Sequence, residues 1–247
     1  MAAPMAHKEL MHSDATLLDT KQHNKYRSAV GSMQYFVSNT QWHLAHTLSR
    51  LGSKNAAPTK GDMAQLDQTI AWLAHNADRK ISGPRVKGTN WEVYSDSDQS
   101  GDRRTGNRSH TGVVILCNGA PVFWRSKKQP VTSTSSAMAK IYALSEAVRD
   151  ARLNAWKSEE LGLQTKYPID IQVDNSTGVV FQSKMNPDSK LKGMIDLRYA
   201  WVRELQDSNN TRAIKVHTSN NVADIRTKIN AMAEQCLKDY MLCHWKT

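Results

Sequence analysis

Two carboxylates at the end of one strand-like run constrain the fold more than any other feature of the sequence. Residues 91–95 have the pattern of a buried strand, and Asp96 and Asp98 follow directly, before a turn-rich polar segment. A carboxylate at the end of a buried strand is held rigidly, and a second one beside it makes an oxygen-rich corner suited to Mg²⁺. Taken alone, the run favours the simpler alternative of a strand that ends in an acidic turn.

Two further acids occur in similar settings. Asp174 follows the apolar run 169–173, and Asp224 opens a helical stretch after the strand-like run 213–216. The recurrence of acids at strand ends favours a metal-binding corner over an acidic turn.

The composition narrows the class of protein and of partner. The 247 residues suffice for one large domain, or for one domain with an appendage. A net charge of +10 favours a polyanionic partner such as nucleic acid, with a basic soluble protein as the alternative. The three cysteines form no CxxC pair, which argues against a disulfide scaffold and favours an intracellular reducing compartment.

No stretch has the length and apolarity of a membrane span or the pattern of a secretion signal. An organelle presequence is poor in acids, whereas Glu9, Asp14 and Asp19 arrive early. We therefore expect the cytoplasm, or an organelle whose presequence is not visible in this chain. One short cluster could contact a metal, although no partner motif accompanies it: Cys236, Cys243 and His244.

The first third of the chain shows the 3.6-residue period of amphipathic helices. A helical stretch covers residues 25–51, with a break at 39–40, and a second helix begins at the capping sequence 59–62. Trp72 is expected in the core, beside a buried face made of Met63, Leu66, Ile70, Leu73 and Ala77. A Pro/Gly-containing linker at 82–88 marks a boundary, which divides the chain into a helical region 1–88, a domain 89–230 and a C-terminal helical tail 231–247.

Beyond the linker the pattern changes to strands that alternate with helices. The turn Asn118-Gly119 predicts a hairpin between its flanking strands. The expected strands are 91–95, 110–117, 122–125, 169–173 and 212–217, and the expected helices are 137–161, one from Thr177, 195–205 and one from Val222. This order indicates an α/β domain with a mixed sheet.

From residue 91 onward the chain resembles the ribonuclease H domain of copia-type LTR-retrotransposon polyproteins. The matching motifs keep the family's order and spacing: Tyr94-Ser-Asp-Ser-Asp98, Trp124-Arg-Ser-Lys-Lys-Gln129, 135–144, Val173-Asp-Asn175, 195–204 and 223–228. Residues 25–33 and the helices after them are similar to the segment that connects reverse transcriptase to ribonuclease H. The resemblance implies a ribonuclease H-like fold, with a five-stranded mixed sheet flanked by helices and preceded by a small helical region.

The resemblance also implies four acids that hold two Mg²⁺ ions about 4 Å apart for hydrolysis of the RNA strand of an RNA–DNA hybrid. The first, third and fourth acids correspond to Asp96, Asp174 and Asp224, with Asp98 as an additional metal ligand if the site is active. The second should be a glutamate in a Ser-Ser-x-Glu-Ala-Glu-Tyr pattern, but Met138 and Lys140 stand at the two glutamate positions.

Lys140 decides the functional interpretation. Its ammonium group repels Mg²⁺ and can pair with Asp96 or Asp174, so we expect neither a metal nor another cofactor. Glu146 cannot replace the missing acid, because six residues turn a helix by about 240° and advance it by nearly two turns. The connecting segment also departs from the family, with Gln41-Trp-His43 in place of an Arg-Pro-Asp run.

Two functions follow from these patterns. The first is a domesticated, catalytically inactive ribonuclease H-like protein that serves as a structural or RNA-binding subunit of a larger assembly with protein partners, such as a ribosome or another ribonucleoprotein. The alternative is an active Mg²⁺-dependent ribonuclease H within a retrotransposon polyprotein. Basic residues expected to contact phosphates, or otherwise to be solvated, are Arg103, Arg104, Arg108, Lys127, Lys128, Lys184, Lys190 and Lys192.

Overall fold

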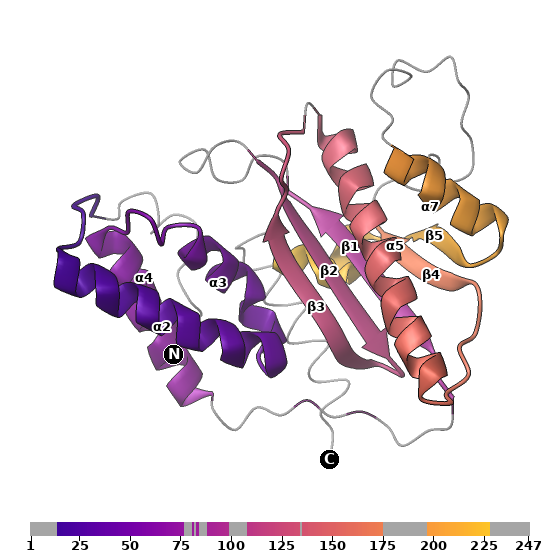
Figure 1. Cartoon of the computed structure of the whole chain (residues 1–247), viewed down its shortest axis with the longest axis horizontal. Helices are drawn as coiled ribbons and strands as arrows, with labels where there is room; N and C mark the ends of the chain where they lie inside the picture. The colour runs from indigo at the N-terminus through magenta and orange to yellow at the C-terminus, as the bar shows by residue number, and fades with distance from the viewer. Residues whose placement is uncertain are drawn as a thin grey trace.

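The structure is a computed structural model that describes residues 14–76, 81, 83, 88–98, 108–133, 135–174 and 197–227, with the backbone alone for 197–199, 225 and 226. Its helices are α2 (Thr20–Asn39), η1 (Trp42–Leu44), α3 (Ala45–Gly52), α4 (Lys60–His75), α5 (Ser136–Glu160), α7 (Leu197–Asp207), η3 (Thr218–Asn220) and η4 (Val222–Arg226). Its strands are β1 (Trp91–Ser97), β2 (His110–Cys117), β3 (Ala120–Lys128), β4 (Ile169–Val173) and β5 (Thr211–Lys215). Figure 1 shows α2, α3 and α4 grouped on one side of the sheet, with α5 and α7 across it.

The strands form one mixed sheet in the order β3-β2-β1-β4-β5. β1, β2 and β3 pair antiparallel, whereas β1, β4 and β5 pair parallel. The ribonuclease H-like fold expected from the sequence, a five-stranded mixed sheet flanked by helices and preceded by a helical region, is confirmed.

Local signals set the ends of several elements. Asn118 and Gly119 both have positive φ, 53° and 81°, as the tight turn between β2 and β3 requires. The Ser135 side chain caps α5 by accepting from the backbone N–H of Met138, and Gly162, with φ of 77°, follows the end of the helix. α5 therefore matches its expected bounds within one residue.

Other bounds differ from expectation. β3 is longer than the predicted 122–125, β1 continues to Ser97, and β5 covers 211–215 rather than 212–217. α2 begins five residues before the predicted start, because Asp19 caps it by accepting from the backbone N–H of Gln22. The helix predicted from Val222 is a short 3₁₀ helix within the described residues. The helix predicted from Thr177 and the C-terminal helical tail lie outside the described residues.

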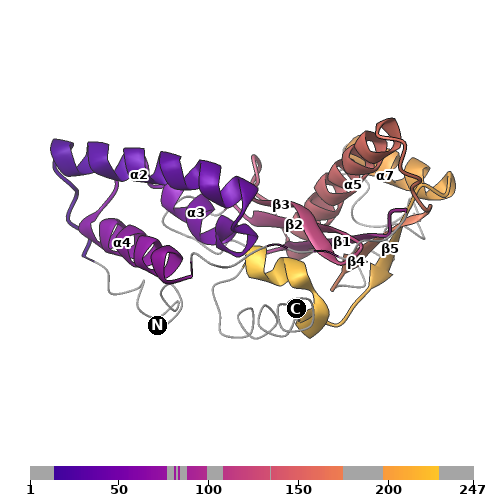
Figure 2. The same cartoon turned by 90° about the horizontal axis from the view of Figure 1, so that it is seen from below.

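One face of the sheet packs against α5. Val93, Val113 and Ile115 are fully buried on this face, and they form one cluster with Leu144 and Val148 of the helix. Figure 2 shows α5 and α7 on the same side of the sheet and η4 on the other. Burial of this apolar face on α5 supplies the main core of the α/β part.

The N-terminal helices have a core of their own, which includes Tyr26, Leu48, Leu66 and Trp72. The predicted capping box at the start of α4 is present, with the Thr59 and Asp62 side chains each accepting from the other's backbone N–H. The core position expected for Trp72 is confirmed, but the prediction for Ile70 was wrong, because its side chain is 40% exposed. The buried face of α4 runs instead through Gln65, Leu66, Thr69 and Trp72.

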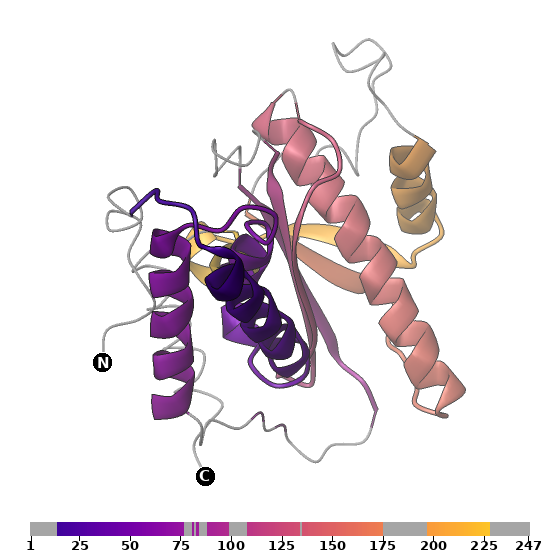
Figure 3. The same cartoon turned by 60° about the vertical axis from the view of Figure 1, so that its left-hand side comes forward.

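The helical region also covers the face of the sheet opposite α5 (Figure 3). Trp42 of η1 is 3% exposed and clusters with Tyr94, Val114 and Leu116 of the sheet and with residues of η4. The indole N–H of Trp124 in β3 donates to the Val37 carbonyl of α2 at 3.1 Å. The helical region and the sheet therefore share an apolar interface in addition to their separate cores. Across the ranges that the structure describes, every helix is too short or too polar to cross a membrane.

Candidate functional site

Asp96 and Asp174 meet at one edge of the sheet. β1 and β4 are adjacent and parallel, so their carboxyl ends lie at the same edge. Asp96 is the sixth residue of β1 and is 2% exposed, and Asp174 directly follows β4. We call Asp96, Asp174 and the adjacent Lys140 the acidic corner.

Lys140 reaches the acidic corner from α5, the helix that packs on one face of the sheet. Its Nζ lies 2.6 Å from Asp174 Oδ1 and 3.9 Å from Asp96 Oδ1. The Lys140 side chain is 25% exposed, whereas the side chains of Asp96 and Asp174 are 0% and 8% exposed. One ammonium group thus compensates two largely buried carboxylates, which would otherwise repel each other.

The chain after β5 closes the corner from the other side. The Thr227 hydroxyl donates a short hydrogen bond to Asp96 Oδ2 and lies 3.2 Å from the Asp224 backbone carbonyl oxygen. Asn221 donates through Nδ2 to the Ser95 carbonyl at 3.1 Å and accepts through Oδ1 from the Ala223 N–H at 3.1 Å. The η4 segment that carries Asp224 is therefore fixed to the end of β1.

Replacing Asn221 by alanine should destabilise the chain by about 2 kcal/mol, because the mutation leaves the buried Ser95 carbonyl and Ala223 N–H without their partner. Chemical denaturation with circular dichroism measures this loss. The neighbouring substitution Asn220→Ala, at an exposed residue, serves as the control and should change stability by less than about 0.5 kcal/mol. Equal losses for the two variants would contradict the anchoring role of Asn221.

The two other acids considered for the site are engaged elsewhere. The Asp98 carboxylate accepts a short hydrogen bond from the backbone N–H of His110, and the Asp98 N–H donates to the His110 carbonyl at 3.2 Å, so Asp98 ties the ends of β1 and β2 together. Glu146 Oε2 lies 2.9 Å from Arg125 NH1 and 2.6 Å from Arg149 NH2. Glu146 therefore serves an ion-pair cluster between β3 and α5, in agreement with the prediction that it does not reach the acidic corner.

The acidic corner does not fit a pair of magnesium ions. Mg²⁺ demands near-octahedral oxygen coordination at 2.0–2.1 Å, whereas here the Lys140 ammonium lies 2.6 Å from Asp174 and 3.9 Å from Asp96 and repels a second cation. Within the described ranges, no three His, Cys, Asp or Glu side chains are grouped so that they could hold a metal ion. Residues Cys236, Cys243 and His244 lie outside those ranges.

Basic side chains gather on the other flank of α5. Of the predicted phosphate contacts, Lys127 and Lys128 end β3, and Arg108 NH1 lies 3.4 Å from the Pro130 carbonyl oxygen. The remaining predicted contacts lie outside the described residues: Arg103, Arg104, Lys184, Lys190 and Lys192.

Arg125 and Arg149 belong to the same basic group, and sequence reasoning missed both. Arg125 donates to Glu146 and makes a short contact with Asp150, while burial lowers the pKa of its guanidinium, an effect that Glu146 opposes and Arg149 reinforces. Alternation along β3 could have found Arg125, since it lies on the same face of the strand as Lys127.

The strand order and the helix α5 that crosses the sheet give the chain a ribonuclease H-like fold. Sequence comparison then gives the relatives. The chain is 27% identical over 208 residues to the retrovirus-related Pol polyprotein from transposon TNT 1-94 of Nicotiana tabacum, and 29% identical over 230 residues to that from transposon RE2 of Arabidopsis thaliana. These alignments cover 83% and 92% of this chain but only 15% of either polyprotein. Its homologues thus include retrovirus-related Pol polyproteins from plant copia-type transposons.

Other comparisons are more limited. The chain is 32% identical over 126 residues, 51% of its length, to the secreted RxLR effector protein 161 of Plasmopara viticola, of which 88% is covered. No protein-family model matches the chain.

Solved structures similar to the chain include LC11-RNase H1 in complex with an RNA/DNA hybrid, with a TM-score of 0.42, 16% identity and coverage of 56% of this chain and 94% of the other. The N-terminal RNase H domain of a Mycobacterium tuberculosis protein matches with a TM-score of 0.40 and 14% identity, over 62% of this chain and 99% of the other.

These findings favour one of the two functions predicted from the sequence over the other. They support the polyprotein context that belonged to the alternative, and nothing in them supports a domesticated subunit of a ribonucleoprotein. A net charge of +10 suits an RNA–DNA hybrid as well as a ribosome-like assembly, because both partners are polyanions.

Proposed function

We propose that this chain is the ribonuclease H region of a copia-type Pol polyprotein that binds nucleic acid, in the first place an RNA–DNA hybrid, without hydrolysing it. The single observation that carries the proposal is the position of the Lys140 ammonium, 2.6 Å from Asp174 and 3.9 Å from Asp96. In the family, those carboxylates would hold the ions that activate water and stabilise the leaving oxygen.

The substitution removes two requirements of metal-assisted hydrolysis together. A carboxylate that should bridge the ions is lost, and a positive charge is placed beside the two aspartates that remain. A lysine ammonium can neutralise these aspartates, but it has no open coordination position at which to bind a water molecule and lower its pKa, as a metal ion does. Asp96, Asp174 and Asp224 are therefore proposed to be remnants of a metal site, with Lys140 as its internal cation.

Nucleic-acid binding has separate support. The net charge is +10, and the basic side chains of Arg108, Lys127 and Lys128 lie at the ends of β2 and β3, near the same edge of the sheet as the acidic corner. Contacts of this type recognise backbone phosphates and give little sequence preference. The division of the chain into 1–88, 89–230 and 231–247 also remains a proposal.

The test is to incubate the chain with a labelled RNA–DNA hybrid in Mg²⁺ or Mn²⁺ and to follow binding and cleavage together. We expect a complex whose affinity falls steeply with salt, and an intact RNA strand after long incubation. Asp174→Asn is the matched control, because it removes a carboxylate that any residual metal site would need. Cleavage by the wild type that Asp174→Asn abolishes would show instead an active Mg²⁺-dependent ribonuclease H. Absence of hybrid binding at low salt would exclude the binding function.

A further inference from the structure

A cavity of about 170 Å³ opens between β3, the start of β2 and α5, on the flank of the helix opposite the acidic corner. Four cationic side chains line it, Arg125, Lys127, Lys128 and Arg149, and one carboxylate, that of Glu146. We call this the basic cavity. One ordered water needs only about 10–15 Å³ by the same kind of measure, so the basic cavity has room for a tetrahedral oxyanion together with water.

The cationic groups of the basic cavity differ in how far they are paired and exposed. Arg125 is held between Glu146 and the buried Asp150, so its guanidinium is largely neutralised and fixed in place. Arg149 also pairs with Glu146, but its side chain is 54% exposed, and Lys127 is exposed as well. Arg149 Nε also lies 3.9 Å from Asp150 Oδ1, so two carboxylates, those of Glu146 and Asp150, face the two arginines. The four cationic side chains that line the basic cavity still outnumber these carboxylates, which favours an incoming anion.

Uncharged polar side chains complete the lining. Thr111, Gln129 and Tyr142 also face the basic cavity, and Gln129 is fixed by hydrogen bonds from its Nε2 to Thr111 Oγ1 at 3.1 Å and to the Ala139 carbonyl at 3.0 Å. Pro130, whose carbonyl accepts from Arg108, lies on the rim. Lys127 and Arg149, which are separate in the sequence, thus line one cavity, and Arg108 contacts the Pro130 carbonyl beside it.

The basic cavity lies within reach of a ligand seated on the acidic corner. Lys127 pairs across the sheet with Thr111, and Thr111 pairs with Ser97, the residue after Asp96. Adjacent strands are about 4.8 Å apart, so two strand spacings separate Lys127 from β1 by about 10 Å. Phosphates of one nucleic-acid strand follow each other every ~3.4 Å along the helix axis, so phosphates a few positions apart can lie over both places.

We propose that the basic cavity binds a backbone phosphate of a nucleic acid that also lies across the acidic corner. The proposal rests on the hybrid binding proposed above and adds the place where the phosphate is held. Arg149 and Lys127 make the charged contacts, and Arg125 is a positioning residue that keeps β3 and α5 at the spacing the cavity needs.

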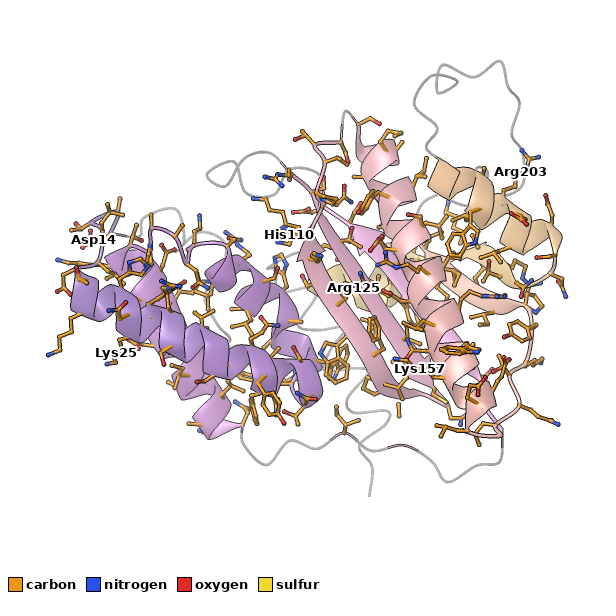
Figure 4. The ribbon with its side chains drawn as sticks, viewed as in Figure 1. Asp14, Lys25, His110, Arg125, Lys157 and Arg203 are labelled. Carbon is orange, nitrogen blue, oxygen red and sulfur yellow. The ribbon has the colours of Figure 1, made fainter. Side chains whose placement is uncertain are left out.

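The experiment compares two double variants of the full chain that remove the same charge. Lys127→Gln with Arg149→Gln alters the basic cavity, whereas Lys157→Gln with Lys166→Gln alters exposed lysines at or beyond the far end of α5, where Figure 4 labels Lys157 well away from Arg125. Fluorescence anisotropy with an RNA–DNA hybrid in EDTA measures Kd between 50 and 200 mM salt. Lys127→Gln alone leaves the ion pairs of Arg125 and Arg149 in place and provides a variant in which folding is undisturbed.

We expect the cavity variant to raise Kd about tenfold and to lower the slope of log K against log salt by about 1.5–2, with roughly half the slope change for Lys127→Gln alone. The control variant should change Kd less than threefold. Equal weakening by both double variants would overturn the proposal, because it would mean that net charge alone is responsible. A wild-type chain that fails to bind hybrid contradicts the proposed function itself, whereas hybrid binding that is insensitive to the cavity variants contradicts only the cavity proposal.

Inorganic phosphate tests whether the basic cavity binds free phosphate or a phosphate of a nucleic-acid backbone, since both present the same oxyanion. If millimolar phosphate raises the Tm of the wild type but not of the cavity variant, while both bind hybrid equally, the basic cavity is a site for free phosphate and not for a nucleic-acid backbone. If phosphate competes with the hybrid in the wild type and loses this effect in the cavity variant, the result supports the backbone phosphate.

Discussion

Replacing Lys140 by glutamate is expected to turn the acidic corner into a site that responds to divalent cations. Without cations the variant should be less stable than the wild type by about 3 kcal/mol or more, because the new carboxylate faces Asp96 and Asp174, whose side chains are 0% and 8% exposed. Added Mg²⁺ or Mn²⁺ should restore about 2.7 kcal/mol once the cation reaches 100 times its Kd. The wild type, with its own ammonium in place, should show no such gain.

Chemical denaturation at constant ionic strength, with and without the divalent cation, measures the gain in stability. Lys140→Gln is the matched control, since it removes the positive charge without supplying a ligand, and it should respond to cations far less than Lys140→Glu. The same proteins can be tested for hybrid cleavage. Activity in Lys140→Glu alone would identify Lys140 as the reason that the wild type does not cleave the hybrid. A wild type stabilised by Mg²⁺ as strongly as Lys140→Glu would mean that the ammonium does not exclude the ion.

Trp42→Ala should cause the second large effect, a loss of about 3–5 kcal/mol in the free energy of unfolding. Trp42 is 3% exposed and packs between the helical region and the sheet, against Tyr94, Val114 and Leu116. Removing the indole leaves a cavity at the interface that joins the two cores. For a chain of this size the Tm should fall by roughly 10 °C, at 2–4 °C for each kcal/mol.

Trp156→Ala provides the control, because Trp156 is 56% exposed on α5 and the same atoms are removed. Its expected change lies within about 0.5 kcal/mol. A thermal scan by circular dichroism measures the Tm of both variants and of the wild type. If Trp42→Ala is as harmless as Trp156→Ala, the helical region does not contribute to the stability of the sheet.

The sequence determined the local features of this protein. The Asn118-Gly119 turn, the capping box of Thr59 and Asp62, and the start of α5 at Ser135 depend on backbone and side-chain groups within a few residues of each other, so the sequence specifies them directly. The alternation of strands and helices also indicated a mixed sheet, whereas the meeting of Asp96 and Asp174 was implied by the resemblance to the ribonuclease H domain. The apolar residues of α4 were compatible with more than one buried face, and the local pattern placed Ile70 on the wrong one. The packing partner decides which face of a helix is buried.

Contacts between distant elements were decided only by the tertiary structure. The sequence could say that Lys140 pairs with Asp96 or Asp174, but the packing angle of α5 on the sheet brings its Nζ to 2.6 Å from Asp174 and leaves Asp96 at 3.9 Å. The gathering of Arg125, Lys127 and Arg149 around the basic cavity likewise needs β3 and α5 to be side by side. Trp42 and Trp124 occur in separate stretches of sequence, and only the apposition of the helical region and the sheet gives them a common interface. In each case the interaction energy depends on separations of a few ångströms between side chains on different elements, and sequence periodicity does not encode these separations.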